Sequence, residues 1–254
     1  MSERILDQNS QTAGETLTIG RLGETPITVR GLTWLPASQL LLWAIMTRSS
    51  RKNKPEEGFF WHVVEGALTS SAILGAEWSH NIAHVLLADW IGKPMDELRI
   101  QAGMPRCFYN ELNDSEVSPR EHVIRALGGP IINLLLLPVA ALVKFTSKPG
   151  TISRETAKVF HQTNQFLFVV SLLPIPGIDG GPVLKWSLVE KGCDIEEADR
   201  AVQQVNGPLS IILGLFSSWS FLKNKKLLGL FSGLLALISL GVFTGLIKED
   251  EIPM

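Results

Sequence analysis

The apolar residues of this chain gather into long runs separated by blocks of charge, and this segregation limits the folds that it can adopt. Apolar residues make up 45% of the 254 residues, and charged residues only 19%. A helix that crosses a bilayer needs about 20 predominantly apolar residues. The segments that approach this length are residues 32–46, 58–90, 123–143, 159–183, 209–222 and 227–247. We therefore predict an integral, multi-pass membrane protein that is mainly α, with about six transmembrane helices.

The six segments form one predicted membrane domain over residues 32–247. The first and fifth are the shortest, and runs of about 10–14 apolar residues also suit a helix buried in a soluble core. The polar stretches are residues 1–31, with a short strand pair, residues 91–121, a partly β surface loop, and residues 248–254, a C-terminal tail. In the surface loop, an alternating pattern that breaks at Gly103 and Pro105 favours a small β-hairpin.

The charge of the chain excludes one class of partner. A formal net charge of −2 gives no basis for binding nucleic acid. The lipid bilayer is the partner that the composition implies, and the sequence leaves the formation of an oligomer open.

One of the apolar segments, residues 58–90, carries ionisable side chains, which are costly within a membrane and tend to mark function. His80 and His84 are four residues apart there, so they lie on the same face of a helix. This spacing allows two imidazole nitrogens to bind one metal ion. The alternative is a pair of histidines bonded to neighbouring helices. Burying two imidazoles without a partner costs free energy, which favours a metal in an apolar span.

A zinc site with two histidines needs a third protein ligand. Asp179 is the candidate, because it lies in a stretch of prolines and glycines, residues 172–182, that will break the fourth segment. Broken backbone at membrane depth is tolerated where it is buried in protein or lines a wet cavity. The alternative is a surface turn that ends the span, since Asp-Gly is common in turns.

Three motifs together resemble those of the site-2 protease family of intramembrane zinc metalloproteases. They are His80-x-x-x-His84, Leu127-Gly-Gly-Pro-Ile-Ile-Asn133 and Leu172-Leu-Pro-Ile-Pro-Gly-Ile-Asp-Gly-Gly181. The strand pair near the start also looks like that family, and the resemblance runs from residue 17 to residue 186. It implies that His80, His84 and Asp179 bind zinc. It also implies that transmembrane segments of other membrane proteins are the substrate or ligand.

Two residues depart from the family pattern. The family has a catalytic Glu directly after the first histidine, and here that position is Asn81. A neutral amide can hydrogen-bond a water molecule but cannot take its proton, and general-base catalysis is worth roughly 100- to 10,000-fold. The family usually has an Asn eight residues before the Asp, where it helps to hold substrate, and here that residue is Ser171. Asn133 and Asn164 are the other polar residues that we expect to face the cavity, although solvation of a helix end also explains Asn164.

Glu77 lies one helical turn before His80 and on nearly the same face as His84. It could act as a substitute base, as a fourth zinc ligand that closes the site, or as an acceptor that orients a histidine. The alternative without a role in the site is a glutamate whose side chain extends to the membrane edge.

Three functions follow from these residues. The first is a proteolytically inactive or impaired homologue that binds or regulates membrane proteins. The second is an active intramembrane metalloendopeptidase that uses Glu77 or another group as base. The third is a non-proteolytic metal-binding or transport scaffold. Asn81 favours the first over the second, because the base is the part of the mechanism that is least easily replaced.

Overall fold

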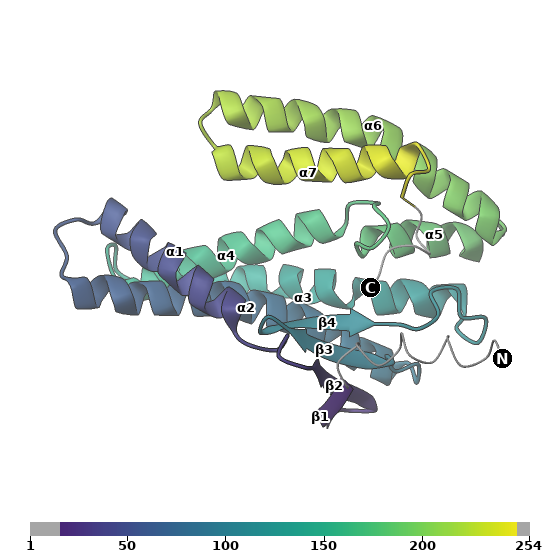
Figure 1. Ribbon diagram of the computed structural model, residues 1–254, viewed down its shortest axis with the longest axis horizontal. Coiled ribbons are helices and arrows are strands. Elements are labelled where there is room, and N and C mark those ends of the chain that lie inside the picture. Colours follow the sequence, from purple (N-terminus) through teal and green to yellow (C-terminus); the bar gives the residue numbers. More distant parts are fainter. Residues whose placement is uncertain (1–15, 248–254) are drawn as a thin grey trace, which may run out of the picture. The chain divides into compact units, whose positions relative to one another are not determined.

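The computed structural model describes residues 16–247, and this part of the chain contains seven helices and four strands (Figure 1). The protein is mainly helical with a small sheet, as the sequence predicts. The expected polar stretch before residue 16 and the C-terminal tail at 248–254 lie outside the described residues. The chain divides into two compact units. The first comprises Met1–Asn110 and Ile132–Gln165, and the second comprises Glu111–Ile131 and Phe166–Met254.

The sheet belongs to the first unit. Its strands are β1 (Thr16–Leu22), β2 (Thr25–Arg30), β3 (Glu97–Gln101) and β4 (Met104–Phe108), in the order β1-β2-β3-β4. β1 with β2 and β3 with β4 are antiparallel pairs, whereas β2 and β3 run parallel. The strand pair and the hairpin predicted from the sequence are both present. The parallel pairing, which joins them into one sheet, was not predicted.

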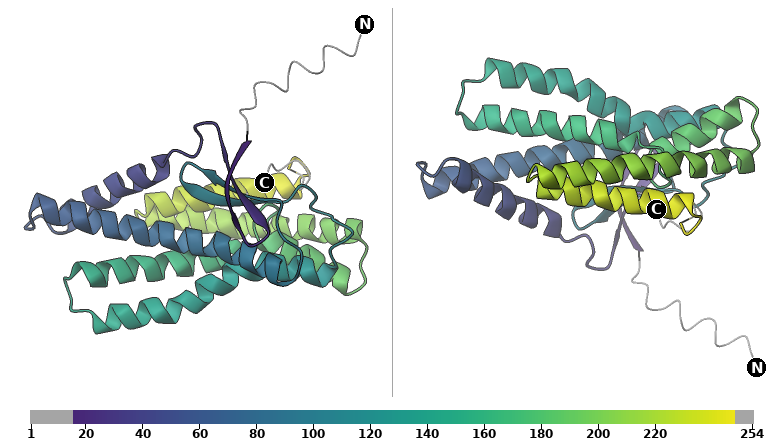
Figure 2. Two further views of the ribbon diagram at one scale, coloured as in Figure 1. Left: turned by 90° about the horizontal axis from the view of Figure 1, so that it is seen from below. Right: turned by 90° about the horizontal axis from the view of Figure 1, so that it is seen from above.

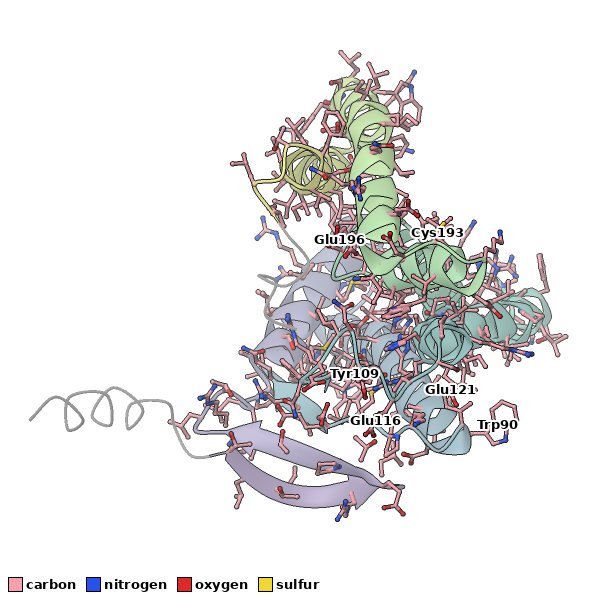
Figure 3. All side chains as sticks on the ribbon, turned by 90° about the vertical axis from the view of Figure 1, so that its right-hand side faces the viewer. Trp90, Tyr109, Glu116, Glu121, Cys193 and Glu196 are labelled. Carbon is pink, nitrogen blue, oxygen red and sulfur yellow. The ribbon has the colours of Figure 1, made fainter. Side chains whose placement is uncertain are left out.

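Two helices of the first unit, α1 (Ala37–Asn53) and α2 (Phe59–Trp90), lie side by side in all views (Figures 1 and 2). The first predicted segment, residues 32–46, is offset from α1. The reason is Pro36, which precedes the first helical residue and has no N–H to donate inside a helix. α2 matches its predicted segment. Its last residue, Trp90, is 77% exposed (Figure 3), which suits an anchor at a membrane interface.

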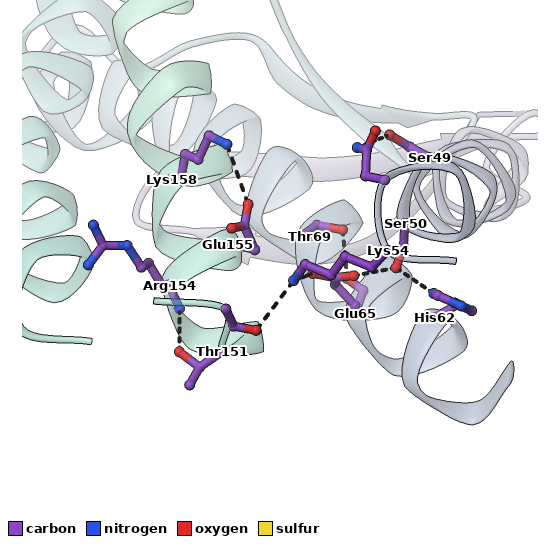
Figure 4. Close-up of polar contacts among 12 residues, drawn as sticks. Ser49, Ser50, Lys54, His62, Glu65, Thr69, Thr151, Arg154, Glu155 and Lys158 are labelled. Carbon is purple, nitrogen blue, oxygen red and sulfur yellow. Dashed lines mark hydrogen bonds and ion pairs between the residues drawn. The ribbon is translucent and has the colours of Figure 1, made fainter. Parts of the chain in front are cut away.

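Buried polar side chains hold the closed end of the α1–α2 hairpin together (Figure 4). The Ser50 hydroxyl hydrogen-bonds Glu65 and lies 2.8 Å from His62 Nδ1. Lys54 Nζ is 2.9 Å from Glu65 Oε1, and it also donates to the backbone oxygen of Gly150 at 3.4 Å. Since buried carboxylates need partners, this cluster fixes the hairpin and ties it to the loop before the fourth helix.

The remaining helices are α3 (Pro119–Thr146), α4 (Ile152–Ser171), α5 (Gly180–Glu190), α6 (Ile195–Leu222) and α7 (Lys226–Phe243). The break expected in the fourth segment is present, because α4 ends at Ser171 and α5 begins at Gly180. α6 is twice as long as the fifth predicted segment, 209–222. It starts in polar sequence, where the Asp194 side chain caps the helix by accepting from the Glu197 N–H at 2.7 Å. Cys193 and Glu196 flank this start (Figure 3).

Three of the described helices, α3, α6 and α7, are long and apolar enough to cross a membrane. Their exposed side chains include many large apolar residues, such as Leu135, Leu142, Ile211, Leu215 and Leu237. Such surface is stable in lipid and unfavourable in water. The prediction of six crossings is not confirmed by length and composition, because α1 has only 17 residues and polar or charged residues interrupt the apolar runs of α2 and α4.

Candidate metal centre

The two histidines of the motif lie on one face of α2 and converge. His80 Nε2 and His84 Nε2 are 3.2 Å apart, and the two rings meet edge to face with centroids separated by 4.8 Å. Both side chains are buried. Two nitrogens that bind one tetrahedral zinc ion at 2.0–2.1 Å lie about 3.3 Å from each other. The pair therefore has the spacing of two ligands on a single zinc ion.

Helices α3 and α4 supply two buried amides to the same unit. Asn133 Oδ1 lies 2.6 Å from His80 Nδ1, and Asn133 Nδ2 donates to Asn164 Oδ1 at 2.9 Å. Both asparagines are 0% exposed. We expected them to face a substrate cavity, and the structure places Asn133 directly against the first histidine. Sequence reasoning missed this contact, although an asparagine within the apolar run of α3 is a signal that could have suggested a buried partner.

Asp179 belongs to the second unit, at the residue before α5. It has helical dihedral angles, and its side chain does not cap the helix that it precedes. The glycines that follow it are required by close packing. A Cβ on Gly180 would lie 2.4 Å from backbone atoms of Leu172, and one on Gly181 would lie 2.6 Å from the Ile175 oxygen. Only glycine allows α5 to begin this close to the broken stretch.

Asn206 of α6 holds the broken stretch from the other side. Its side-chain Nδ2 donates to the backbone oxygen of Pro174 at 2.7 Å, and Ser239 of α7 donates to Asn206 Oδ1 at 2.7 Å. The Ile178 N–H, which would serve the Pro174 oxygen in a continuous helix, bonds the Ile175 oxygen instead, so the Asn206 side chain satisfies this carbonyl. The segment that carries Asp179 is thus fixed by hydrogen bonds to α6 and, through it, to α7.

Comparisons with known proteins agree with this arrangement. No protein-family profile matches the chain. A Methanocaldococcus jannaschii protein, MJ0611, which is provisionally named a zinc metalloprotease, is 35% identical over 71 residues, and these are 28% of this chain and 37% of that protein. The chain thus matches little more than a third of that relative's length. The structure of the site-2 protease from Methanocaldococcus jannaschii superposes with a TM-score of 0.50 at 13% identity, covering 94% of this chain and 97% of that one.

The chain therefore has the fold of a site-2 protease. Three helices of the described residues are long and apolar enough to cross a bilayer. The protein is therefore an integral, multi-pass membrane protein, as its sequence predicts.

Asn81 directly follows His80 on α2, and the structure shows what its amide contacts. Asn81 Nδ2 donates to the backbone oxygen of Glu77 at 3.0 Å and faces Glu77 Oε1 at 3.4 Å. The Cys107 thiol of β4 lies 3.6 Å from Asn81 Oδ1. Because a backbone oxygen only accepts, the NH₂ end of the amide must face Glu77. No pattern in the sequence connects Cys107 with Asn81.

Ser171 is the last residue of α4. Its hydroxyl is buried and points back to its own helix, 3.5 Å from the Phe168 oxygen. A role for this residue toward substrate stays a prediction.

Proposed function

We propose that this protein is a zinc-binding member of the site-2 protease fold that engages transmembrane segments of other membrane proteins and is impaired in proteolysis. The observation that carries the proposal is Asn81, a side chain without base character on the helix of the two converging histidines.

The proposed metal ligands are His80, His84 and Asp179, which offer two imidazole nitrogens and one carboxylate oxygen. Two histidines and a carboxylate are a ligand set of catalytic zinc sites. The zinc metalloprotease name of the relative supports the same metal. A zinc ion held there would supply a Lewis acid and an activated water.

The impairment follows from what Asn81 can and cannot do. Its NH₂ group is directed to the Glu77 carbonyl and its oxygen to the Cys107 thiol, so the amide is already hydrogen-bonded at both ends. Neither end can take a proton from water near neutral pH. Loss of a general base costs roughly 100- to 10,000-fold in rate.

A second candidate function, an active intramembrane metalloendopeptidase, is favoured by one contact. The Glu77 carboxylate lies 3.4 Å from Asn81 Nδ2, one turn along α2, so it is beside the residue that stands where the family has its base. Glu77 would then accept the proton in place of the missing glutamate.

The proposal includes six crossings of the membrane. β2 and β3 pair in one sheet, so the chain is on the same side of the bilayer before α1 and after α2. The two helices between these strands therefore cross as a pair or not at all. At 32 residues, α2 is about 48 Å long, which is enough to span a bilayer. With α3, α4, α6 and α7, the pair gives six crossings.

The two candidate functions are separated by Asn81→Glu, with Asn81→Gln as the control that has the same length but no base. In the impaired protein, Asn81→Glu raises cleavage of a model transmembrane substrate at least about 10-fold and Asn81→Gln does not. Zinc content, measured on each purified variant, should stay unchanged. The proposal is wrong if the wild type already cleaves, and if Glu77→Gln abolishes that cleavage while zinc stays bound.

A further inference from the structure

Four groups of the first unit form a continuous series of hydrogen bonds that ends at a backbone oxygen. Asn164 Nδ2 donates to the Phe160 oxygen at 2.8 Å. Asn164 Oδ1 lies 2.9 Å from Asn133 Nδ2, and Asn133 Oδ1 lies 2.6 Å from His80 Nδ1. The series crosses from α4 to α3 to α2, and both amides in it are fully buried.

The backbone oxygen decides the direction of every bond in the series. A carbonyl oxygen only accepts, so the end of Asn164 that faces Phe160 must be its NH₂ group. The Asn164 oxygen then faces Asn133, which must present its own NH₂ group there. The Asn133 oxygen is left for His80, and because that oxygen only accepts, His80 Nδ1 must carry a proton. This deduction uses positions alone, so it does not depend on how the amide oxygens and nitrogens are assigned.

We propose that Asn133 and Asn164 are positioning residues that hold His80 as the tautomer protonated at Nδ1, with the Nε2 lone pair directed to the metal position beside His84. The role as a ligand rests on the proposed zinc site. In a neutral imidazole, a proton on Nδ1 leaves Nε2 unprotonated. His80 Nε2 is the atom that lies 3.2 Å from His84 Nε2.

Because both amides are buried, they constrain the tautomer of His80 strongly. The amides are 0% exposed, so an alternative arrangement in which two oxygens or two NH₂ groups faced each other would leave buried polar atoms unsatisfied. The opposite tautomer of His80 would place a proton where the metal binds. Removing a partner that orients a ligand histidine typically weakens metal affinity about 10- to 100-fold.

The first test is Zn²⁺ affinity of the full chain in detergent, measured by competition with a chromophoric chelator. Asn133→Leu is expected to weaken binding about 10- to 100-fold, and Asn133→Gln, which keeps an acceptor for His80 and an NH₂ group for Asn164, to weaken it less. Asn164→Leu should weaken binding less. The double leucine variant should bind no worse than Asn133→Leu, because Asn164 acts through Asn133. Additive losses, or equal losses for leucine and glutamine, would overturn the proposal.

A matched control removes a buried hydrogen bond elsewhere. Ser217 of α6 donates to the Gly229 oxygen at 2.7 Å, and Ser217→Ala deletes this bond without touching the histidines. Zinc affinity of this variant should equal that of the wild type. If it falls as far as in Asn133→Leu, the loss reflects general destabilisation and the positioning role is wrong.

The second test reads the tautomer without metal. In the zinc-free protein labelled with ¹⁵N-histidine, the His80 signals, assigned by their loss in His80→Gln, should show a protonated Nδ1. Asn133→Leu should lose this preference. A His80 protonated at Nε2 in the wild type refutes the positioning role whether or not zinc binds. A correct tautomer in a wild type that binds no zinc would refute the proposed zinc site instead.

Discussion

The two glycines after Asp179 provide the sharpest test of how the broken segment is built. Replacing Gly180 by Ala adds a Cβ that would lie 2.4 Å from backbone atoms of Leu172 and from the Leu173 oxygen. These are main-chain atoms of a stretch that Asn206 also holds, so they cannot move aside as the end of a side chain can. Overpacking of this kind costs about 1–3 kcal/mol.

The matched control is Gly214→Ala in α6, where nothing lies within 4 Å of the added Cβ. Alanine is favoured over glycine inside a helix by about 0.8–1 kcal/mol, so this variant should be more stable than the wild type. The two identical substitutions are therefore expected to act in opposite directions. For a domain of this size, about 1 kcal/mol corresponds to a shift in Tm of about 2–4 °C.

The assay is thermal unfolding of the purified protein in detergent, followed by tryptophan fluorescence. Gly180→Ala should lower Tm by about 2–12 °C, and Gly214→Ala should raise it. Equal Tm values for the two variants would show that the start of α5 does not pack against the broken stretch, and that this packing does not position Asp179.

Two further substitutions are checked by the same unfolding measurement. Asn206→Leu leaves the Pro174 oxygen without its side-chain donor and should destabilise the protein by about 1–3 kcal/mol; an unchanged Tm would contradict this. Lys54→Met leaves the Glu65 carboxylate, only 5% exposed, without its 2.9 Å partner and should cost a similar amount, about 1–3 kcal/mol. Lys158→Met, which breaks an exposed ion pair, should change stability by less than about 1 kcal/mol, and equal losses would refute the argument from burial.

Local patterns in the sequence predicted the parts of the site that depend on one helix. The spacing of His80 and His84 fixes their common face whatever surrounds the helix. The prolines and glycines near Asp179 predict a broken helix for equally local reasons, since proline removes donors and glycine tolerates close approach. Both features are present in the structure.

The parts that were missed depend on contacts between distant segments. The bond from Asn133 to His80 requires knowing that α3 packs on α2, which no periodicity reveals. The same holds for Cys107 beside Asn81 and for Asn206 beside Pro174. The length of α6 was predicted too short because its first half is polar and amphipathic, and the prediction rested on apolar runs.

The parallel pairing of β2 with β3 has a consequence for biogenesis. During synthesis β1 and β2 emerge first, and the free edge of β2 has no strand to bind until α1 and α2 have both been made. If α1 and α2 fail to return the chain to its starting side, β3 lies on the opposite side of the bilayer from β2 and cannot pair with it. On the proposed six-crossing topology, β3 joins β2 only in a chain whose first helical hairpin has returned to its starting side, so completion of the sheet depends on correct insertion.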